Sequence, residues 1–273
     1  MKRHASRVIA LWVLVLSGGL QAAPPPIAAF ARREAILGAA LSPDGRYLAL
    51  VETQHGAPIA AVRDLHAADA PFQLVMSSAA DNHFFIDWCR WAGNTRLLCG
   101  LIAPVHEPGY VYIATRLVAV DADGRHMKVL VQGSGLASDQ GQRQDQVVDW
   151  NPGKPDTVLV TAQASLLDYM DRNLTGGSGI IAGATEEEYP SVYELNVDNG
   201  RMSVRVGAHR PLRHYLSDHH GNPRLGWGVI DDTLRTEVQV RDLKTNAWHR
   251  LESYEAFSRE HVLVPIAVCA DRP

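Results

Sequence analysis

Three histidines gather around one predicted turn of the 273-residue chain: His214, His219 and His220. Imidazole is a common metal ligand, but a metal site needs three or four convergent side chains that are themselves held by hydrogen bonds. The sequence offers no further ligand at a suitable spacing, so we predict a loop without a metal ion here. No cofactor is expected elsewhere in the chain.

One serine, Ser178, has glycine neighbours that resemble those of a catalytic nucleophile. A nucleophile elbow reads Gly-x-Ser-x-Gly and lies between a strand and a helix. Residues 176–180 read Gly-Gly-Ser-Gly-Ile, so the last glycine is missing, and the segment falls inside a long insertion. We therefore predict a flexible loop at Ser178 and assign no catalytic residue.

Two of the three cysteines, Cys89 and Cys99, lie five residues on either side of Asn94 in a predicted hairpin turn. Directly opposed residues of a hairpin lie at a distance that suits a disulfide. Two buried thiols that pack as small apolar side chains are the alternative interpretation, and the sequence leaves both open. Cys269 has no evident partner.

These residues lie within a pattern that occurs four times: strand, tight turn, strand, a strand that ends near aspartate, a second turn, and a fourth strand. Repeated units of four antiparallel strands are typical of β-propeller blades. We predict an all-β, incomplete β-propeller of about four blades, with residues 261–268 as the start of a fifth. The opening turns are residues 42–45, 92–94, 151–156 and 218–223.

The second strand of each unit is apolar at consecutive positions. A strand with one face in solvent would alternate between apolar and polar residues. Burial on both faces requires a sheet that is stacked between two neighbouring sheets, as radially packed blades are. These strands fall at residues 47–51, 96–101, 157–160 and 224–229.

The units differ in length because two of them carry excursions between their second and third strands. We expect loops at residues 103–115 and 163–190. Loops inserted at equivalent places of a repeat gather on one face, and functional residues concentrate on such faces. The second excursion contains the acidic run Glu186, Glu187 and Glu188.

The composition is that of an ordinary globular protein, with 46% hydrophobic and 21% charged residues. The net charge is −4, so no basic excess indicates nucleic acid as a partner. No stretch of the mature chain has the length and apolar character of a membrane span.

The first residues have the anatomy of a secretory signal peptide. Lys2, Arg3 and Arg7 precede an apolar run over residues 8–16, and small residues follow it. Cleavage is expected after Ala22, with an uncleaved anchor as the alternative. We therefore divide the chain into a signal peptide (1–22), a linker (23–34) and a partial propeller domain (35–273), and expect a periplasmic or secreted location.

Residues 40–49 read Ala-Leu-Ser-Pro-Asp-Gly-Arg-Tyr-Leu-Ala, and later turns read Trp-Ala-Gly-Asn and Leu-Asn-Val-Asp-Asn-Gly. With the leader, these residues resemble the amino-terminal propeller of exported bacterial peptidases of the prolyl oligopeptidase family, including its dipeptidyl- and acylaminoacyl-peptidase branch. The resemblance spans about residues 30–268. The Ser-Pro-Asp-Gly turn also occurs in propellers of periplasmic translocation proteins and of lactonases.

The resemblance implies a propeller that caps an α/β-hydrolase domain, and the Gly-x-Ser-x-Gly motif of that domain is absent here. The chain is therefore expected to be non-catalytic and to serve as the substrate-gating and binding propeller of a serine peptidase, with peptides or the missing α/β-hydrolase domain as partners. Dipeptidyl peptidases hold the substrate's amino terminus with paired glutamates, which gives Glu186, Glu187 and Glu188 a corresponding role. A solvated acidic loop is the default interpretation of that run.

Two further interpretations remain. A stand-alone periplasmic propeller that serves as a scaffold for protein–protein interaction fits the same fold. A lactonase-type hydrolase would need carboxylates around a central metal ion, at positions that the sequence alone does not identify.

Overall fold

The computed structural model describes residues 35–78, 84–131, 143–162, 189–230, 233–255 and 262–269. Within these ranges all regular secondary structure is β, which confirms the predicted fold class. The predicted signal peptide and linker lie outside the described residues. The strands are β1 (Ile36–Leu41), β2 (Tyr47–Gln54), β3 (Ala57–Asp64), β4 (Gln73–Ser77), β5 (Phe85–Trp91), β6 (Arg96–Glu107), β7 (Tyr110–Asp121), β8 (Lys128–Val129), β9 (Val147–Asp149), β10 (Thr157–Ala162), β11 (Ser191–Asn196), β12 (Met202–Val206), β13 (His214–Ser217), β14 (Pro223–Ile230), β15 (Arg235–Arg241) and β16 (Trp248–Glu255).

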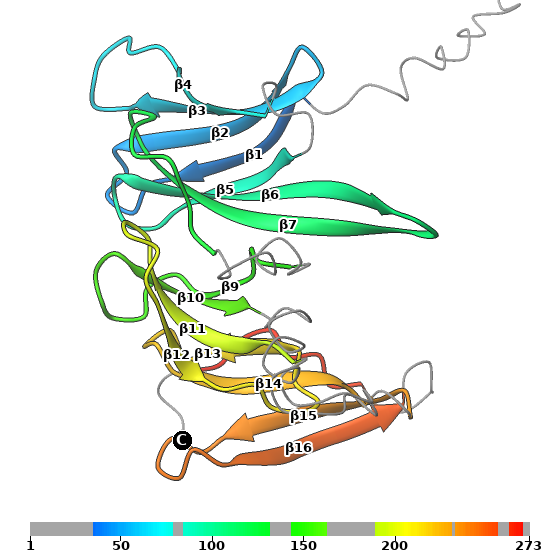
Figure 1. The fold of residues 1–273 in the computed structure, drawn as a ribbon. Helices are drawn as coiled ribbons and strands as arrows, with labels where there is room; N and C mark the ends of the chain where they lie inside the picture. The colour runs from blue at the N-terminus through cyan, green and yellow to red at the C-terminus, as the bar shows by residue number, and fades with distance from the viewer. Residues whose placement is uncertain are drawn as a thin grey trace, which may run out of the picture. The chain divides into compact units, whose positions relative to one another are not determined.

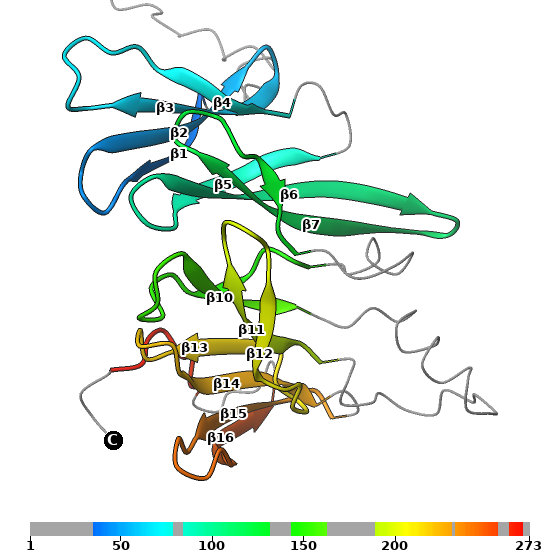
Figure 2. The same ribbon diagram turned by 60° about the vertical axis from the view of Figure 1, so that its left-hand side comes forward.

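The strands form four antiparallel sheets of four consecutive strands each (Figures 1 and 2). Every strand pairs with its neighbour in the sequence, from β1–β2–β3–β4 in the first sheet to β13–β14–β15–β16 in the fourth. A four-stranded antiparallel meander that repeats along the chain is the blade of a β-propeller. The described residues therefore contain four propeller blades.

The turn between β1 and β2 shows why the Ser-Pro-Asp-Gly sequence folds as it does. The Ser42 hydroxyl donates to Asp44 over 2.6 Å, and the Asp44 carboxylate also accepts the backbone N–H of Arg46 over 3.1 Å. Gly45 takes a φ of 74°, a conformation that glycine adopts without steric cost. Local hydrogen bonds thus fix the reversal and set the register of the first blade.

Adjacent sheets pack face to face, and the strands of the middle sheets contribute to two different apolar clusters. In β6, Leu97 and Cys99 belong to the cluster shared with the first sheet, whereas Leu98 belongs to the cluster shared with the third sheet. In β10, Val158 and Leu159 likewise point into different clusters. Alternate residues of a strand face opposite sides of its sheet, so both middle sheets are buried on both faces.

Cys89 of β5 and Cys99 of β6 are register partners, and a disulfide joins them, with a Cα–Cα distance of 4.1 Å. Cys99 is fully buried within the first apolar cluster. The bond therefore links two strands of the second blade inside its packed face. Cys269 is a free, exposed thiol.

The expected loop over residues 103–115 is wrong. These residues continue β6 and β7 into a hairpin, with partners from Ile102 and Thr115 out to Glu107 and Tyr110. The turn is Pro108 and Gly109, where proline presets one backbone angle and Gly109 takes a φ of 93°. The pairing of β5 with β6 ends at Ile102, so the hairpin extends beyond its own sheet (Figure 1).

The prediction that residues 261–268 form the first strand of a fifth blade is also wrong for the part that the structure describes. Residues 262–269 form no ladder with any described strand. Val264 and Ile266 are exposed, and the segment is held to the fourth sheet where the Tyr254 hydroxyl donates to the Leu263 carbonyl oxygen over 3.1 Å. A strand requires a paired edge, and this segment has the composition of a strand without such a pairing.

Candidate functional site

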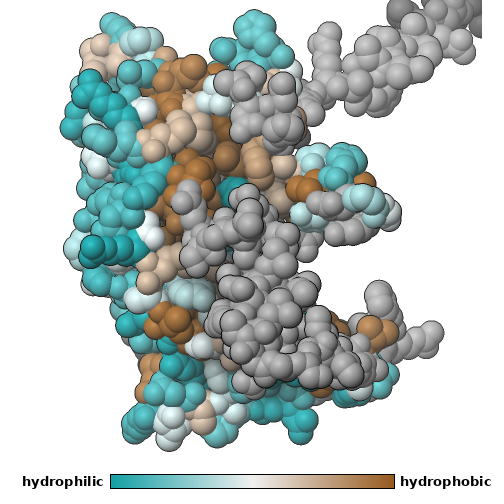
Figure 3. Space-filling view, in the orientation of Figure 1, coloured by the Kyte–Doolittle hydropathy of each residue, from teal (hydrophilic) through white to brown (hydrophobic). Residues whose placement is uncertain are grey.

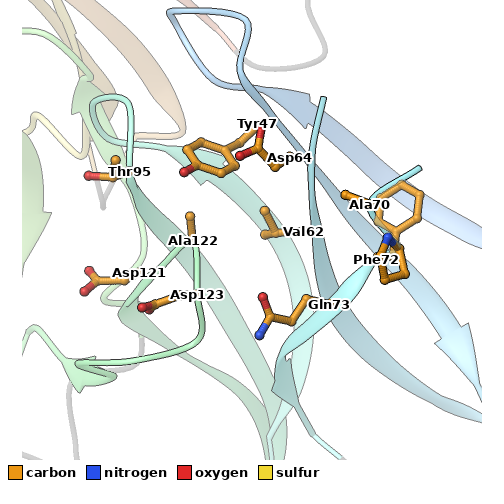
Figure 4. A pocket seen from close by; sticks show the side chains of 11 residues that line it. Tyr47, Val62, Asp64, Ala70, Phe72, Gln73, Thr95, Asp121, Ala122 and Asp123 are labelled. Carbon is orange, nitrogen blue, oxygen red and sulfur yellow. The ribbon is translucent and has the colours of Figure 1, made fainter. Parts of the chain in front are cut away.

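A first cavity of about 710 Å³ lies between the first two sheets, at the turns that follow β3 and β7 (Figure 4). Asp121 and Asp123 line one side of it, and Phe72 and Gln73 line another. Its carboxylates resemble a cation site at first sight. The bonding of these groups decides whether they remain available to a ligand.

The two most enclosed carboxylates of this cavity already have cationic partners. Asp64 accepts hydrogen bonds from Arg46 Nε and Nη2 over 3.0 and 2.8 Å. Asp121 accepts one from Arg96 over 2.5 Å and lies 2.6 Å from Nδ1 of His126. Burial alone would raise the pKa of Asp121, but the bonds to His126 and Arg96 hold it below its usual value. These ion pairs position the blade turns, so we do not assign a ligand to this cavity.

A second cavity of about 320 Å³ lies between the third and fourth sheets. We call it the cationic pocket. It is formed where β9 and β13 begin, β10 ends, and the chain approaches β11, so it flanks the longer excursion that the sequence identified. The residues that line it are Arg143, Gln146, Thr161, Ala162, Pro190, Arg213 and His214.

Aromatic rings and hydrogen bonds hold the walls of the cationic pocket. The Arg213 guanidinium lies 4.5 Å from the centre of the Tyr189 ring, which is fully buried. The His214 ring stacks on Trp227 with 5.2 Å between ring centres. Stacking on an aromatic face limits the rotamers of both basic side chains, so their charges have defined positions.

Polar contacts fix the rest of the wall. The Thr161 hydroxyl donates to Oε1 of Gln146 over 3.2 Å, and Thr161 is buried. The Tyr215 hydroxyl donates to the carbonyl oxygen of Pro190 over 3.1 Å, and burial raises the pKa of Tyr215 well above its usual value. The pocket is thus built by side chains from both sheets.

The described ionisable side chains that line the cationic pocket are all basic. Desolvation lowers the pKa of His214, and repulsion from Arg143 and Arg213 lowers it further. The imidazole is therefore harder to protonate than that of a solvent-exposed histidine.

The structure brings only some of the residues singled out in the sequence to this pocket. His214 lines it, whereas the backbone N–H groups of His219 and His220 donate to Ser217 and Asp218 in the next turn. No group of three or more histidine, cysteine, aspartate or glutamate side chains suited to a metal ion occurs among the described residues. Glu186, Glu187, Glu188 and Ser178 lie outside the described residues.

A buried serine and aspartate meet at the interface of the third and fourth sheets. Ser217 donates its hydroxyl proton to Asp149, and its oxygen accepts the backbone N–H of His219 over 2.9 Å. Asp149 also accepts the backbone N–H groups of Asn151 and Gly221. This bonding joins two blades, and it is not the bonding of a nucleophilic serine, whose proton is accepted by a histidine.

The two arginines of the cationic pocket are not predicted as site residues from the sequence. Arg143 and Arg213 are 70 positions apart in the sequence. Arg143 lies four positions before β9, whereas Arg213 lies directly before β13. The two positions are not equivalent in the repeat, so aligning the units does not bring the arginines together.

The chain matches no protein-family model and no curated protein sequence. Among solved structures it is similar to an oligogalacturonate lyase in complex with manganese, at 16% identity and a TM-score of 0.44 over 80% of this chain. It is also similar to TolB from Acinetobacter baumannii, at 16% identity and a TM-score of 0.38 over 79% of this chain. A third similar structure is a puromycin-hydrolysing peptidase from Mycobacterium tuberculosis, at 14% identity and a TM-score of 0.44 over 85% of this chain.

This chain spans 53%, 43% and 32% of the lengths of those three proteins, respectively. At these identities the likeness concerns the fold alone. Within the described ranges, the chain has no helix with the length and apolar character needed to cross a lipid bilayer.

Proposed function

We propose that this chain is the substrate-binding and substrate-gating propeller of an exported serine peptidase of the prolyl oligopeptidase family, and that it performs no hydrolysis itself. An α/β-hydrolase domain would provide the nucleophile, and the compartment would be the periplasm or the exterior. The observation that carries the proposal is the cationic pocket, which opens between two blades beside the longest insertion. Function in repeat folds concentrates at such inserted segments.

The dimensions of the pocket support selection by size. A cavity of about 320 Å³ lies at the lower end of the range for small-ligand sites. It accommodates the end of a short peptide and excludes a folded domain. A propeller with such pockets would admit short peptides to a hydrolase domain and refuse intact proteins.

The acidic run at Glu186, Glu187 and Glu188 is part of this proposal as an acceptor for the substrate's ammonium group. The run leads directly into Tyr189, whose ring lies under Arg213 of the pocket wall. Binding of a free amino terminus needs several acceptors in a site shielded from water. Replacing all three residues by glutamine should weaken the binding of a peptide with a free amino terminus. The binding of the acetylated form of the same peptide should stay unchanged.

Calorimetric titration of the purified mature chain tests the binding role. Peptides of two to six residues should bind, and a folded protein of similar composition should not. Equal binding of both would contradict gating by size, and binding of neither would contradict a substrate-binding role.

The β6–β7 hairpin favours a second candidate function, a stand-alone scaffold for a partner protein. Val111 and Ile113 are 60% and 42% exposed on the part of the hairpin that extends beyond its sheet. Figure 3 shows this arm with apolar and polar side chains next to one another. Exposed apolar residues on a projecting element are typical of contact surfaces.

Replacing Val111 and Ile113 by serine separates the two functions. A scaffold would lose its partner, measured by cross-linking in the exporting cell, while peptide binding stays the same. Retention of all cross-linked partners in the double variant would contradict the scaffold function.

A further inference from the structure

A third cavity, of about 450 Å³, lies along β1 and β5, the first strands of the first and second sheets. These two strands lie side by side (Figures 1 and 2), and Trp150, which follows β9, reaches the same cavity from the third sheet. We call it the indole pocket, because its described lining residues include Trp88, Trp91 and Trp150. Its volume lies within the range of small-ligand sites, whose walls are mostly apolar and aromatic.

Contacts within the protein fix two of these rings. Gly100 allows the Trp88 ring to approach β6 closely, since a Cβ at residue 100 would collide with the indole. The Trp88 N–H donates to Asp145 over 3.3 Å, and the Trp91 N–H donates to the carbonyl oxygen of Ala40 over 2.9 Å. Because both N–H groups are already bonded, these two rings offer a ligand only apolar and π surface.

Trp150 extends the aromatic wall. Its ring meets the Trp88 ring edge to face, with 5.9 Å between ring centres, and the two residues are half-buried. Packing between the blades thus covers only part of each ring, and both rings line the cavity. Leu37 and Leu41 of β1 are exposed and add aliphatic surface to the opposite wall. The cavity is therefore suited to a flat apolar group.

Two charged side chains of β5, Asp87 and Arg90, border the same cavity and are exposed. Within the described part of the chain, neither has a hydrogen-bond or ionic partner. The pairing of β5 with β6 shifts between Ile86 and Trp88, so Asp87 is the extra residue of a β-bulge, a device that redirects side chains near functional sites. A carboxylate accepts hydrogen bonds and a guanidinium donates them, so the pair matches the N–H and C=O groups of a peptide backbone.

We infer that the indole pocket binds an aromatic side chain and that, if the proposed peptide-binding function holds, this side chain belongs to a short peptide whose backbone bonds to Asp87 and Arg90. Aromatic rings gain more from edge-to-face and offset contacts with one another than their buried area alone provides. A cation over the wall is disfavoured, because the Arg90 guanidinium already lies 5.9 Å from the centre of the Trp150 ring.

The experiment titrates N-acetyl-phenylalanine amide and N-acetyl-leucine amide into the isotope-labelled, purified mature chain, with the indole N–H signals followed by NMR. Neither ligand has a free terminus, so both report on recognition of the side chain and its flanking amides. We expect the phenylalanine ligand to bind about threefold to tenfold more tightly. It should shift the signals of Trp88, Trp91 and Trp150 and leave those of Trp227 and Trp248 in place.

Variants locate the effect. Trp150→Leu removes one ring of the wall and should abolish the preference for phenylalanine over leucine. Trp227→Leu is the matched control, because it removes a ring outside the pocket, and should keep the preference. Asp87→Asn should weaken both ligands by a similar factor, since the carboxylate bonds to the backbone that they share.

A second variant fills the cavity without removing any packing. Gly38 lines the pocket, and an added Cβ there meets nothing within 4 Å, so Gly38→Phe should keep the fold and prevent binding. Thermal unfolding of every variant verifies the fold.

The outcomes distinguish this inference from the proposed function. Equal affinities for the two ligands, absence of binding, or binding that survives both Trp150→Leu and Gly38→Phe would overturn the indole pocket as an aromatic site. Peptides of two to six residues that still bind would leave the proposed function intact in those cases. Binding of the phenylalanine ligand without binding of any such peptide would support the inference and overturn the proposed function.

Discussion

The guanidinium group of Arg96 donates from Nε and Nη2 to the backbone carbonyl oxygen of Val197, over 3.4 and 3.3 Å. Arg96 begins the second strand of the second sheet, and Val197 follows the third strand of the third sheet. The same guanidinium bonds to Asp121 of its own sheet. One buried side chain therefore connects two successive blades.

Arg96→Ala should destabilise the chain by about 3 kcal/mol, because Arg96 is only 6% exposed and its loss leaves Asp121 and the Val197 carbonyl without this donor. Urea unfolding monitored by tryptophan fluorescence measures the change. Arg125→Ala, which removes an exposed arginine, should change stability by less than about 0.5 kcal/mol. Similar midpoints for the two variants would contradict the packing of these blades through Arg96.

Gly228→Ala should lower stability by about 2 kcal/mol or more, because a Cβ at this position would collide with the carbonyl oxygen of Pro211. Gly38→Ala is the matched control, since nothing lies within 4 Å of a Cβ there. That variant should be neutral or more stable by up to about 1 kcal/mol. If thermal unfolding shows the two variants to be equally stable, the close approach of residue 211 to β14 does not occur in solution.

Reduction of the Cys89–Cys99 bond should cost about 3 kcal/mol, the entropy expected for opening a loop of this size. Urea unfolding with and without a phosphine reductant measures the difference. Alkylation of the native chain should modify one thiol, Cys269, and alkylation after reduction and unfolding should modify three. Three modified cysteines without reductant would show that the disulfide is absent, and Cys269→Ser controls for the free thiol.

The stability of the chain should fall in two steps as the pH is lowered. The pKa of His214 is depressed by desolvation, with repulsion from Arg143 and Arg213 adding to it. The unfolded chain therefore binds a proton near pH 6.5 that the folded chain does not bind, so stability is full above that pH and declines below it. His214→Gln should flatten urea-unfolding stability between pH 7 and 5, and an unchanged decline would contradict the role of His214.

A second decline in the stability of the chain should occur below about pH 4. Hydrogen bonds lower the pKa of Asp44, mainly from Ser42, and of Asp64, mainly from Arg46. Carboxylates of this kind stabilise the fold above the unfolded pKa of about 3.9, and the contribution is lost as the pH falls through the folded value. Asp64→Asn should reduce this acid step and leave the His214 step in place, as followed by circular dichroism.

The blades are predictable from the sequence because some of their strands are apolar and buried at consecutive positions. Val158, Leu159 and Val160 are consecutive, apolar and fully buried, and their two faces pack into different clusters. No strand with a solvent face tolerates that pattern, so stacking of sheets is predictable from it. The turns are predictable too, because the hydrogen bonds of Asp44 and the conformation of Gly45 lie within the turn itself.

The extent of strand pairing and the contacts between blades are harder to predict. The repeat length indicates an insertion at Val111, Tyr112 and Ile113 and so predicts a loop, whereas Pro108 and Gly109 form a hairpin turn that pairs these residues with β6. Residues 262–269 have strand composition, but composition does not provide a partner edge. The cationic pocket depends on contacts between blades, so Arg143 and Arg213 carry no sign of their proximity in the local sequence.

The most direct test of the proposed non-catalytic role is intact-mass analysis of the purified mature chain after incubation with a fluorophosphonate that labels activated serines. We predict an unmodified mass, together with no hydrolysis of aminoacyl or dipeptidyl chromogenic substrates, because Ser217 is bonded to Asp149 and the Ser178 segment lacks the nucleophile-elbow sequence. A stoichiometric adduct on any serine of this chain would contradict the account.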